Sequence, residues 1–328
     1  MTQVRVQDQP LVDLHVHVLG NGKSGSGCRV AVRWWQQPFI RAMARDIGLE
    51  ILPEDPELDR LFAERLLYWV RESSLAHVVI LACDDLYDES GQRFAGMSGI
   101  FVPNDYVLGL ARDHPEFLPG ISIHPARPDA LDELERCVVA GAVLLKLLPC
   151  VHAIDCNRSI YKPFWKRMAD LGIPLLAHTG GEFSLPINRP DLKSPSCIRL
   201  PLECGVNVIA AHCGTRALPW DRDYFNEFVA MRKTFPNLYG DIAALSQVTH
   251  LRTLEKLREN SERILFGSDY PVITSALWSL LKGWISADEY RRLHAIRNPL
   301  ERKYQLTRSL GFPNRIFLDI WTLFPKQE

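Results

Sequence analysis

The sequence predicts an α/β protein built as a (β/α)8 TIM barrel, and three features of its pattern indicate this fold. Short aliphatic runs recur along the 328 residues, and most of them are followed by a segment with helical periodicity. The runs are apolar on both faces, as expected for strands of a parallel sheet that helices cover. There are eight runs, and eight β/α units in one chain favour a closed barrel over an open doubly wound sheet.

The expected strands begin with LVDLHV near the N-terminus and end with ERILFGSDYP. They are residues 11–16, 77–83, 117–125, 141–149, 173–181, 206–214, 237–245 and 262–271. Amphipathic stretches such as LDRLFAERLLYWVRESS and YFNEFVAMRKTFP lie between them and predict the helices. Because no G-x-G-x-x-G turn follows the first strand, the pattern disfavours a dinucleotide-binding sheet.

The chain contains no low-complexity tract or linker, so we expect a single domain over residues 1–328. Its barrel core would span about residues 11–285, with a C-terminal helical extension over residues 286–328. The glycine-rich GNGKSGSGC after the first strand could cover the barrel mouth as a lid or be a loop without a role. The apolar tail NRIFLDIWTLFP could pack against a second copy in a homo-oligomer or close the barrel's own flank.

Composition limits the classes of partner. Lys and Arg total 38 against 39 Asp and Glu, so the formal net charge is −1 and no charged block favours nucleic acid or an anionic membrane. No apolar run approaches the roughly 20 residues that a membrane span needs. The opening MTQVRVQDQP lacks the layout of a signal peptide, and eight cysteines without a C-x-x-C pair are expected to stay reduced. We therefore expect a cytoplasmic protein that acts on a small molecule.

Ionisable residues stand at the carboxyl ends of five of the apolar strands. They are His15 and His17 in the first strand, Lys146 in the fourth, His178 in the fifth, His212 in the sixth and Asp269 in the eighth. The carboxyl ends of barrel strands meet at one face, which carries the active site in essentially all such enzymes. His15 and His17 are two residues apart, so their side chains project from the same face of the strand.

Imidazole and carboxylate groups are the usual nitrogen and oxygen ligands of Zn²⁺, so this cluster predicts a metal site. A bound ion lowers the pKa of water to about 7 and makes hydroxide available. Each residue taken singly has a structural alternative. His178 and His212 could be hydrogen-bonded core histidines, Asp269 a helix cap, and Lys146 the partner of a nearby carboxylate. The joint occurrence of six such residues favours the metal site.

The motifs DLHVH, LLKLLP, LLAHTGG, IAAHCG, NLYGDIAAL and ILFGSDYP occur in the order found in the amidohydrolase superfamily. From about Val12 to Pro271 the chain resembles the amidohydrolase-related branch, also called amidohydrolase 2, which contains hydrolases, lactonases, decarboxylases and a hydratase. The resemblance implies that His15, His17 and Asp269 hold a first divalent ion, with Zn expected and Mn as the alternative. His178 would be a further ligand in single-ion members.

The same resemblance leaves one or two ions open. In two-ion members a carboxylated Lys146 would bridge the metals, and His178 and His212 would hold the second ion. In single-ion members His212 would instead be a catalytic acid or base. Deaminases of the superfamily carry a glutamate shortly after the strand-five histidine. Glu182 stands one position further along than that pattern and could equally be a polar loop residue.

The expected activity is hydrolysis of a C–O or C–N bond in a lactone, ester or amide by metal-activated water. Asp269 would move the proton, and His212 would stabilise the oxyanion if it does not bind metal. The alternative is non-oxidative decarboxylation of an aromatic or unsaturated carboxylic acid. A barrel that has lost activity and binds a ligand is a third possibility, which the retention of all six residues opposes.

Polar residues on the predicted mouth loops are candidates for substrate binding, and they are Asp84, His124, Arg127 and His152. Arg127 could receive a substrate carboxylate as a bidentate fork, or it could be a salt-bridged loop residue. Asp241, on the seventh strand, could also contact substrate or could hydrogen-bond a ligand histidine. The identity of the substrate does not follow from these residues.

Overall fold

The computed structural model describes residues 9–49 and 53–326, and a sheet of eight parallel strands lies at its centre. The strands, in spatial order, are β1 (Val12–His17), β3 (His77–Leu81), β7 (Phe117–Ile121), β8 (Leu144–Leu147), β9 (Leu175–His178), β10 (Val208–Ala211), β11 (Leu238–Asp241) and β12 (Ile264–Leu265). Each pairs in parallel with the next. All eight predicted runs contain a strand, and the fold is the expected TIM barrel.

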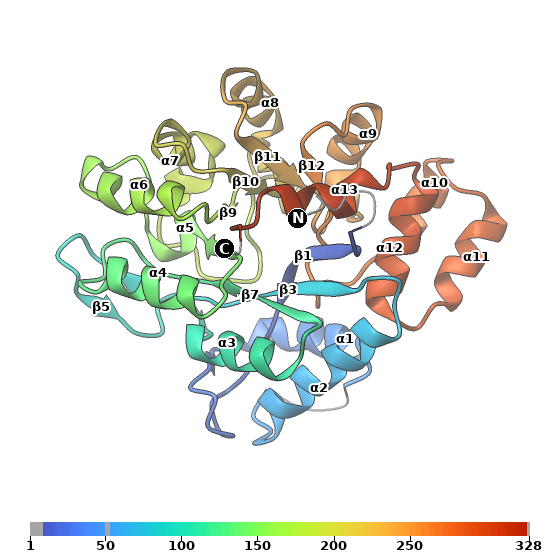
Figure 1. The fold of residues 1–328 in the computed structure, drawn as a ribbon. Helices are drawn as coiled ribbons and strands as arrows, with labels where there is room; N and C mark the ends of the chain where they lie inside the picture. Colours follow the sequence, from blue (N-terminus) through green and yellow to red (C-terminus); the bar gives the residue numbers. More distant parts are fainter. Residues whose placement is uncertain (1–8, 50–52, 327–328) are drawn as a thin grey trace.

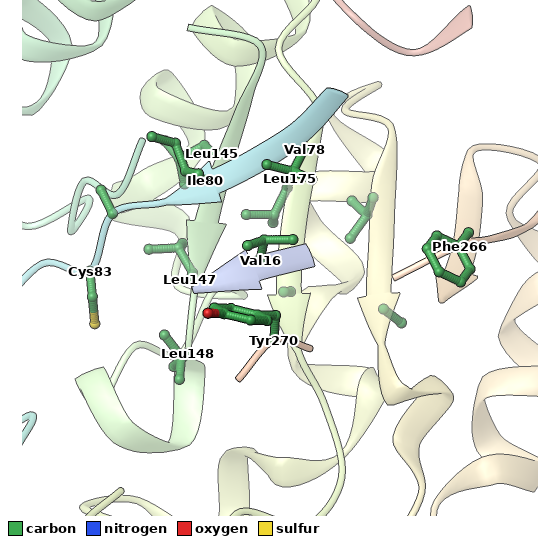
Figure 2. Packing of buried hydrophobic residues seen from close by; sticks show 14 of the residues in the cluster. Val16, Val78, Ile80, Cys83, Leu145, Leu147, Leu148, Leu175, Phe266 and Tyr270 are labelled. Carbon is green, nitrogen blue, oxygen red and sulfur yellow. The ribbon is translucent and has the colours of Figure 1, made fainter. Parts of the chain in front are cut away.

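Backbone contacts close the sheet between its first strand and the segment that follows its last. The amide of Leu14 donates to the Phe266 carbonyl at 3.2 Å, and that of His17 donates to the Tyr270 carbonyl at 2.9 Å. Val16 and Tyr270 form a parallel bridge and lie next to each other in Figure 2. The seam therefore runs directly beside the strand that carries His15 and His17.

Helices surround the strands, and Figure 1 shows them as a ring about the sheet. The α-helices are α1 (Gln37–Asp46), α2 (Leu58–Arg71), α3 (Asn104–Asp113), α4 (Ala130–Val139), α5 (Pro149–His152), α6 (Lys162–Asp170), α7 (Arg199–Glu203), α8 (Phe225–Thr234), α9 (Leu251–Glu259), α10 (Leu277–Leu281), α11 (Ala287–Ala295), α12 (Pro299–Ser309) and α13 (Arg315–Leu318). The 3₁₀ helices are η2 (Trp34–Gln36), η3 (Ser159–Tyr161), η4 (Pro190–Lys193), η5 (Pro195–Ile198), η6 (His212–Gly214), η7 (Val248–His250) and η8 (Asp319–Thr322). None of the described helices combines the length and the apolar character that crossing a bilayer requires.

Alternation along the strands creates two apolar layers. The barrel interior contains Val12, Leu14, Val79, Leu81, Leu144, Leu176, Ile209, Ala211 and Leu265, whereas their strand neighbours pack outward against the helices. Ile320, Leu323 and Phe324 belong to the interior cluster. The apolar tail therefore packs on the barrel of its own chain, and Figure 1 shows this red segment across the middle of the ring.

The C-terminal extension is helical, as predicted, and two of its helices begin at side-chain caps. The Ser286 hydroxyl accepts from the Glu289 amide at the start of α11. The Asn298 side chain accepts from two backbone amides at the start of α12, where Pro299 occupies the first helical position. These local signals fix where the helices begin, and packing on the barrel fixes where they lie.

Two short antiparallel ribbons, which the sequence did not predict, lie in the segments after β1 and β3. One pairs β2 (Arg29–Val30) with β6 (Ile100–Phe101), and the other pairs β4 (Leu86–Tyr87) with β5 (Arg93–Phe94). The buried Asp85 carboxylate binds the guanidinium groups of Arg29 and Arg93. The Arg29–Asp85 ion pair joins the two mouth segments, and the Arg93–Asp85 pair lies within the second of them.

Candidate active site

Three of the predicted metal ligands meet at the closing seam of the barrel. His15 and His17 project from β1, and Asp269 follows β12. The Asp269 Oδ1 atom lies 3.4 Å from His15 Nε2 and 3.2 Å from His17 Nε2. One ligand atom from each residue lies within 4.8 Å of the other two. Burial tends to raise the pKa of Asp269, but the two histidines hold that pKa well below its usual range.

A carboxylate behind His15 sets the orientation of this ring. His15 Nδ1 lies 2.8 Å from Asp241 Oδ2, and both side chains are fully buried. Because a carboxylate accepts hydrogen bonds, Nδ1 carries the proton and Nε2 presents its lone pair. The other Asp241 oxygen accepts from the His212 amide at 2.8 Å. Asp241 thus forms buried hydrogen bonds with His15 and His212. A hydrogen bond to a ligand histidine was one of the two roles predicted for Asp241.

Lys146 reaches the same lone pair from β8. Its Nζ lies 3.0 Å from His15 Nε2, and the side chain is buried because it lies two residues after Leu144, on the same inward face of β8. Burial lowers the pKa of Lys146, while the charges of Asp269 and Asp241 act in the opposite direction. Burial together with the Lys146 charge lowers the pKa of His15 to about 4. The lysine therefore stands within contact distance of the ligand group.

His178 and His212 lie beside this group, and their rings approach to 4.8 Å between centroids. The His212 ring also lies 5.4 Å from that of His15. His178 Nε2 donates to the Gly181 carbonyl at 3.1 Å, and His212 Nδ1 donates to the Ala243 carbonyl at 3.1 Å. In the neutral form, each ring keeps one nitrogen as an acceptor, which suits a metal ligand or a proton acceptor.

A carboxylate that the sequence left ambiguous points toward these histidines. Glu182 Oε2 lies 3.6 Å from His178 Nε2, while Glu182 Oε1 accepts from the Ser184 and Leu185 amides at 2.6 and 3.0 Å. Burial raises the pKa of Glu182. The glutamate is therefore held with one oxygen fixed by the backbone and the other turned to the site.

The four predicted substrate-binding residues form one network at the ends of β3, β7 and β8, in which Asp84, His124 and His152 are buried and Arg127 is half-buried. Arg127 pairs with Asp84 at 3.2 Å and with Asp129 at 2.7 Å, so its guanidinium is already engaged. The Asp84 carboxylate also accepts from the His124 amide at 2.8 Å. The His124 Nε2 atom donates a hydrogen bond to the His152 carbonyl at 3.2 Å. These contacts match the salt-bridged alternative for Arg127.

A cavity of about 150 Å³ is lined by Asp84 and Arg127, together with residues of α3 and α4. Its lining contains none of the six residues predicted for the metal site. Of the four predicted substrate-binding residues, Asp84 and Arg127 therefore line a cavity that the metal-site residues do not line.

Comparison with known proteins identifies the family. A sequence model of the family described as Amidohydrolase matches residues 13–295, which include the whole ligand group. The chain belongs to the amidohydrolase family. This confirms the resemblance that the strand-end motifs indicated, and it makes the protein an enzyme of this family. No curated protein matches the sequence.

Solved structures share the fold of this amidohydrolase. An uncharacterised TIM-barrel protein from Bordetella bronchiseptica superposes with a TM-score of 0.56 at 19% identity, covering 92% of this chain and 99% of the other. A protein described as a probable 2-pyrone-4,6-dicarboxylic acid hydrolase, from Acinetobacter baumannii, gives 0.53 at 13% identity, covering 93% and 100%. The 5-carboxyvanillate decarboxylase of Sphingomonas paucimobilis gives 0.52 at 14% identity, covering 94% and 96%.

The ligand group of the amidohydrolase fits a divalent metal ion. Two imidazoles and a carboxylate form a donor set that Zn²⁺ accepts, and their ligand atoms already converge. The Asp241 contact holds His15 in the tautomer that leaves Nε2 available, as partners of metal-bound histidines do. Gly267 permits this packing, because a Cβ there would lie 2.8 Å from His15 Cβ. The chemistry and convergence of these three residues therefore suit a divalent ion at this site.

Proposed function

We propose that this amidohydrolase uses a divalent ion to hydrolyse a C–O or C–N bond of a small molecule, such as a lactone, an ester or an amide. The observation that carries the proposal is the arrangement around Asp269. Its Oδ1 atom faces His15 and His17. Within residues 9–49 and 53–326, no protein group hydrogen-bonds the other carboxylate oxygen, Oδ2. That oxygen is available to accept a proton.

His15, His17 and Asp269 would hold the ion, with zinc as the proposed metal and manganese as the alternative. When bound, the ion supplies Lewis-acid polarisation of a carbonyl and makes water acidic enough to lose a proton near neutral pH. Asp241 keeps the His15 lone pair directed at this position through its 2.8 Å contact with Nδ1. Lys146 Nζ now occupies the neighbourhood of that lone pair, so loading requires Lys146 to withdraw or to be modified.

Asp269 and His212 would carry out the proton transfers of the hydrolysis. Asp269 Oδ2 accepts a proton from the attacking water as the new C–O bond forms. It returns that proton to the oxygen or nitrogen that leaves as the old bond breaks. His212, with its Nδ1 committed to the Ala243 carbonyl, offers Nε2 as a second proton acceptor or as a ligand. It can donate to an oxyanion only after gaining a proton, because its neutral ring has no N–H to spare.

Carboxylation of Lys146 would extend the site to a second ion. The Lys146 ammonium would first lose a proton. The neutral amine would then form an N–C bond with carbon dioxide and release a second proton, which turns a competing cation into an anionic carbamate ligand. His178 and His212 would complete that second site, since each retains one acceptor nitrogen.

Decarboxylation of an aromatic or unsaturated acid is the second candidate function. It is favoured by Lys146, whose Nζ is a buried amine within 3.0 Å of His15 Nε2 and could receive a substrate carboxylate when protonated. Among the residues that the structure describes, three ligand atoms converge, which is sufficient for one ion. Release of carbon dioxide without uptake of solvent oxygen would identify this reaction.

The proposal is tested with the metal-loaded protein, a panel of lactones, esters and amides, and water labelled with ¹⁸O. We expect one ¹⁸O atom in each acid product and a loss of about 10²–10⁴-fold in turnover for Asp269→Asn. Asp113→Asn, a change at an exposed carboxylate, is the matched control and should leave turnover unchanged. Carbon dioxide release from a panel of carboxylic acids, with no hydrolysis of the first panel, would overturn the hydrolase assignment.

A further inference from the structure

The residues of the candidate active site are largely shielded from solvent. Five of the six residues predicted for the metal site are buried, and His17 is half-buried. The Glu182 side chain is only 8% exposed, although it belongs to the segment between β9 and η4 rather than to the barrel. Segments that connect strands and helices normally lie open to solvent. A substrate that is to reach His15 and Asp269 therefore needs a covering segment to move.

Residues 182–188 form a segment that covers the barrel mouth, and we call this segment the lid. It follows β9, the fifth strand in the order of the sheet, which lies opposite the first strand, β1, in a closed barrel of eight strands. The Ser184 carbonyl of the lid nevertheless accepts from the side chain of Gln36, after β1, at 2.7 Å. The Asn188 side chain donates to the Met97 carbonyl, after β3, at 3.2 Å. The lid therefore reaches from one side of the mouth to the other.

Both ends of the lid are held by backbone contacts. The Gly181 amide donates to the Thr215 carbonyl at 2.9 Å, and a Cβ on Gly181 would lie 2.0 Å from the Ala217 nitrogen. At the other end, the Asn188 amide donates to the Cys150 carbonyl at 2.9 Å. Motion of the lid is therefore expected between these two ends.

The centre of the lid is fastened to η2 and α1. Besides the hydrogen bond from Gln36 to Ser184, the Phe183 ring packs against Trp35 and Phe39, with ring centroids 5.7 and 5.8 Å apart. No residue of α1 is buried, and Trp35 and Phe183 are exposed. Elements with few buried apolar contacts open locally at a low cost in free energy. The lid can therefore separate from η2 and α1 while the barrel stays folded.

The lid also orients a carboxylate at the site. The amides of Ser184 and Leu185 donate to Glu182 Oε1, while Glu182 Oε2 faces His178 Nε2 at 3.6 Å. Lifting the centre of the lid would withdraw these two amides from Glu182. Closure of the lid therefore covers the site and fixes this carboxylate in one step.

The glycine-rich GNGKSGSGC, which was the other candidate for a lid, is fastened to α2. The buried Asp59 carboxylate accepts from the Asn21 and Gly22 amides at 2.6 and 3.1 Å and from the Ser26 hydroxyl. Because these contacts hold the glycine-rich segment against a helix, residues 182–188 are the better candidate for a moving cover.

We propose that the lid is a gate for substrate, which opens when Ser184 separates from Gln36 and closes over the bound molecule. Gln36 is then a positioning residue, because it lies outside the ligand group and acts through the lid. Closure would exclude bulk water, which strengthens the electrostatic interactions inside the site. The inference deepens the proposed function, but its first readout needs neither a metal nor a substrate.

Labelling of the metal-free protein with diethyl pyrocarbonate, followed by mass spectrometry, tests the gate through the accessibility of the buried His178 and His212 imidazoles. Gln36→Ala removes the side-chain amide that holds the lid. We expect it to speed labelling of these two histidines at least about fivefold relative to the exposed His294. Gln37→Ala, at the neighbouring exposed glutamine, is the matched control and should leave the rates within about twofold. Unchanged labelling in Gln36→Ala, or equal acceleration in both variants, would overturn the proposal.

A covalent lock gives the second readout. In Trp35→Cys/Phe183→Cys, a short reagent that joins two thiols should hold the lid closed, since the native rings lie 5.7 Å apart. Cys204→Ser removes the one native thiol that is not buried. We expect the joined protein to label His178 and His212 at least about fivefold more slowly than the same variant before joining, and to turn over substrate at least about tenfold more slowly.

A joined protein that labels or turns over as fast as the unjoined one would contradict the gate. If the parent protein hydrolyses no lactone, ester or amide, the proposed function fails, while the labelling experiment still decides whether the lid controls access to the site.

Discussion

At the scale of single residues, hydrogen bonds decide what each histidine of the site can do. His15, His178 and His212 each commit one ring nitrogen to an oxygen acceptor, which is Asp241 for His15 and a backbone carbonyl for the other two. In a neutral imidazole, this leaves the second nitrogen as an acceptor. Any buried histidine needs a partner for its N–H, and here that partner also fixes which ring nitrogen keeps its lone pair. These hydrogen bonds therefore fix which nitrogen of each histidine is free to bind an ion before any ion is present.

Lys146→Met tests whether the lysine competes with the ion or becomes its ligand. The amine lies 3.0 Å from His15 Nε2, so in the unmodified state its removal frees that lone pair. We expect the variant to bind one equivalent of zinc at least as tightly as the parent protein, as measured by titration and elemental analysis. Two equivalents in the parent and one in the variant would indicate a bridging, carboxylated Lys146.

Lys162→Met, at an exposed position on α6, is the control and should leave stoichiometry unchanged. Loss of all metal from Lys146→Met would contradict the assignment of the first ion to His15, His17 and Asp269.

At the scale of elements, the short strand β12 relies on α13 for support. The Phe266 amide donates to the Ile316 carbonyl at 2.8 Å, and the Phe266 and Phe317 rings lie 4.5 Å apart. Phe266 begins the segment that carries Gly267, Ser268 and Asp269. Helix α13 therefore anchors the backbone that delivers the carboxylate of the ligand group.

Phe317→Ala should consequently weaken the whole fold. Phe317 is fully buried, and deleting such a side chain costs about 3–5 kcal/mol through lost burial and the cavity that remains. Chemical denaturation measures this loss of unfolding free energy. Leu281→Ala, at an exposed apolar residue, should change it by less than about 0.5 kcal/mol. A loss below about 1 kcal/mol for Phe317→Ala would show that α13 is not a support.

At the scale of the whole molecule, the ligand group joins the two ends of the barrel sheet. His15 and His17 lie on the first strand, and Asp269 follows the last, so an ion bound by all three would link the strands that close the barrel. The Leu14 and His17 amides make the backbone contacts of the same seam. Metal binding and barrel closure are therefore expected to be coupled.

Removal of metal should lower the melting temperature of the protein. An ion that binds only the folded chain stabilises it by about 2.7 kcal/mol when its free concentration is 100 times its Kd. Calorimetry before and after chelation measures the shift, and added zinc should restore it. His17→Ala removes one ligand and should melt at nearly the same temperature with and without the chelator. A parent protein indifferent to chelation would argue against an ion at the seam.

The sequence by itself determined the eight strands and the positions of the polar residues at their ends. Each strand can be predicted from its own residues, because a strand that is buried on both faces must be apolar over four or more consecutive positions. A lysine or histidine inside such a run, as at Lys146 and His178, is therefore conspicuous without any knowledge of its neighbours. The helical C-terminal extension could be predicted for the same reason, because helical periodicity depends only on residues that are near one another in the sequence.

Only the tertiary structure decided which polar residues act together. The contact of Asp13 with the Ser268 amide joins positions 255 residues apart, and that of Lys303 with Ile242 joins positions 61 apart. The engagement of Arg127 by Asp84 and the turn of Glu182 toward His178 likewise depend on how loops pack. Local patterning reports whether a residue is buried, but not which distant group meets it there. The Asp13–Ser268 contact forms only when the barrel closes, because closure brings the first and last strands together.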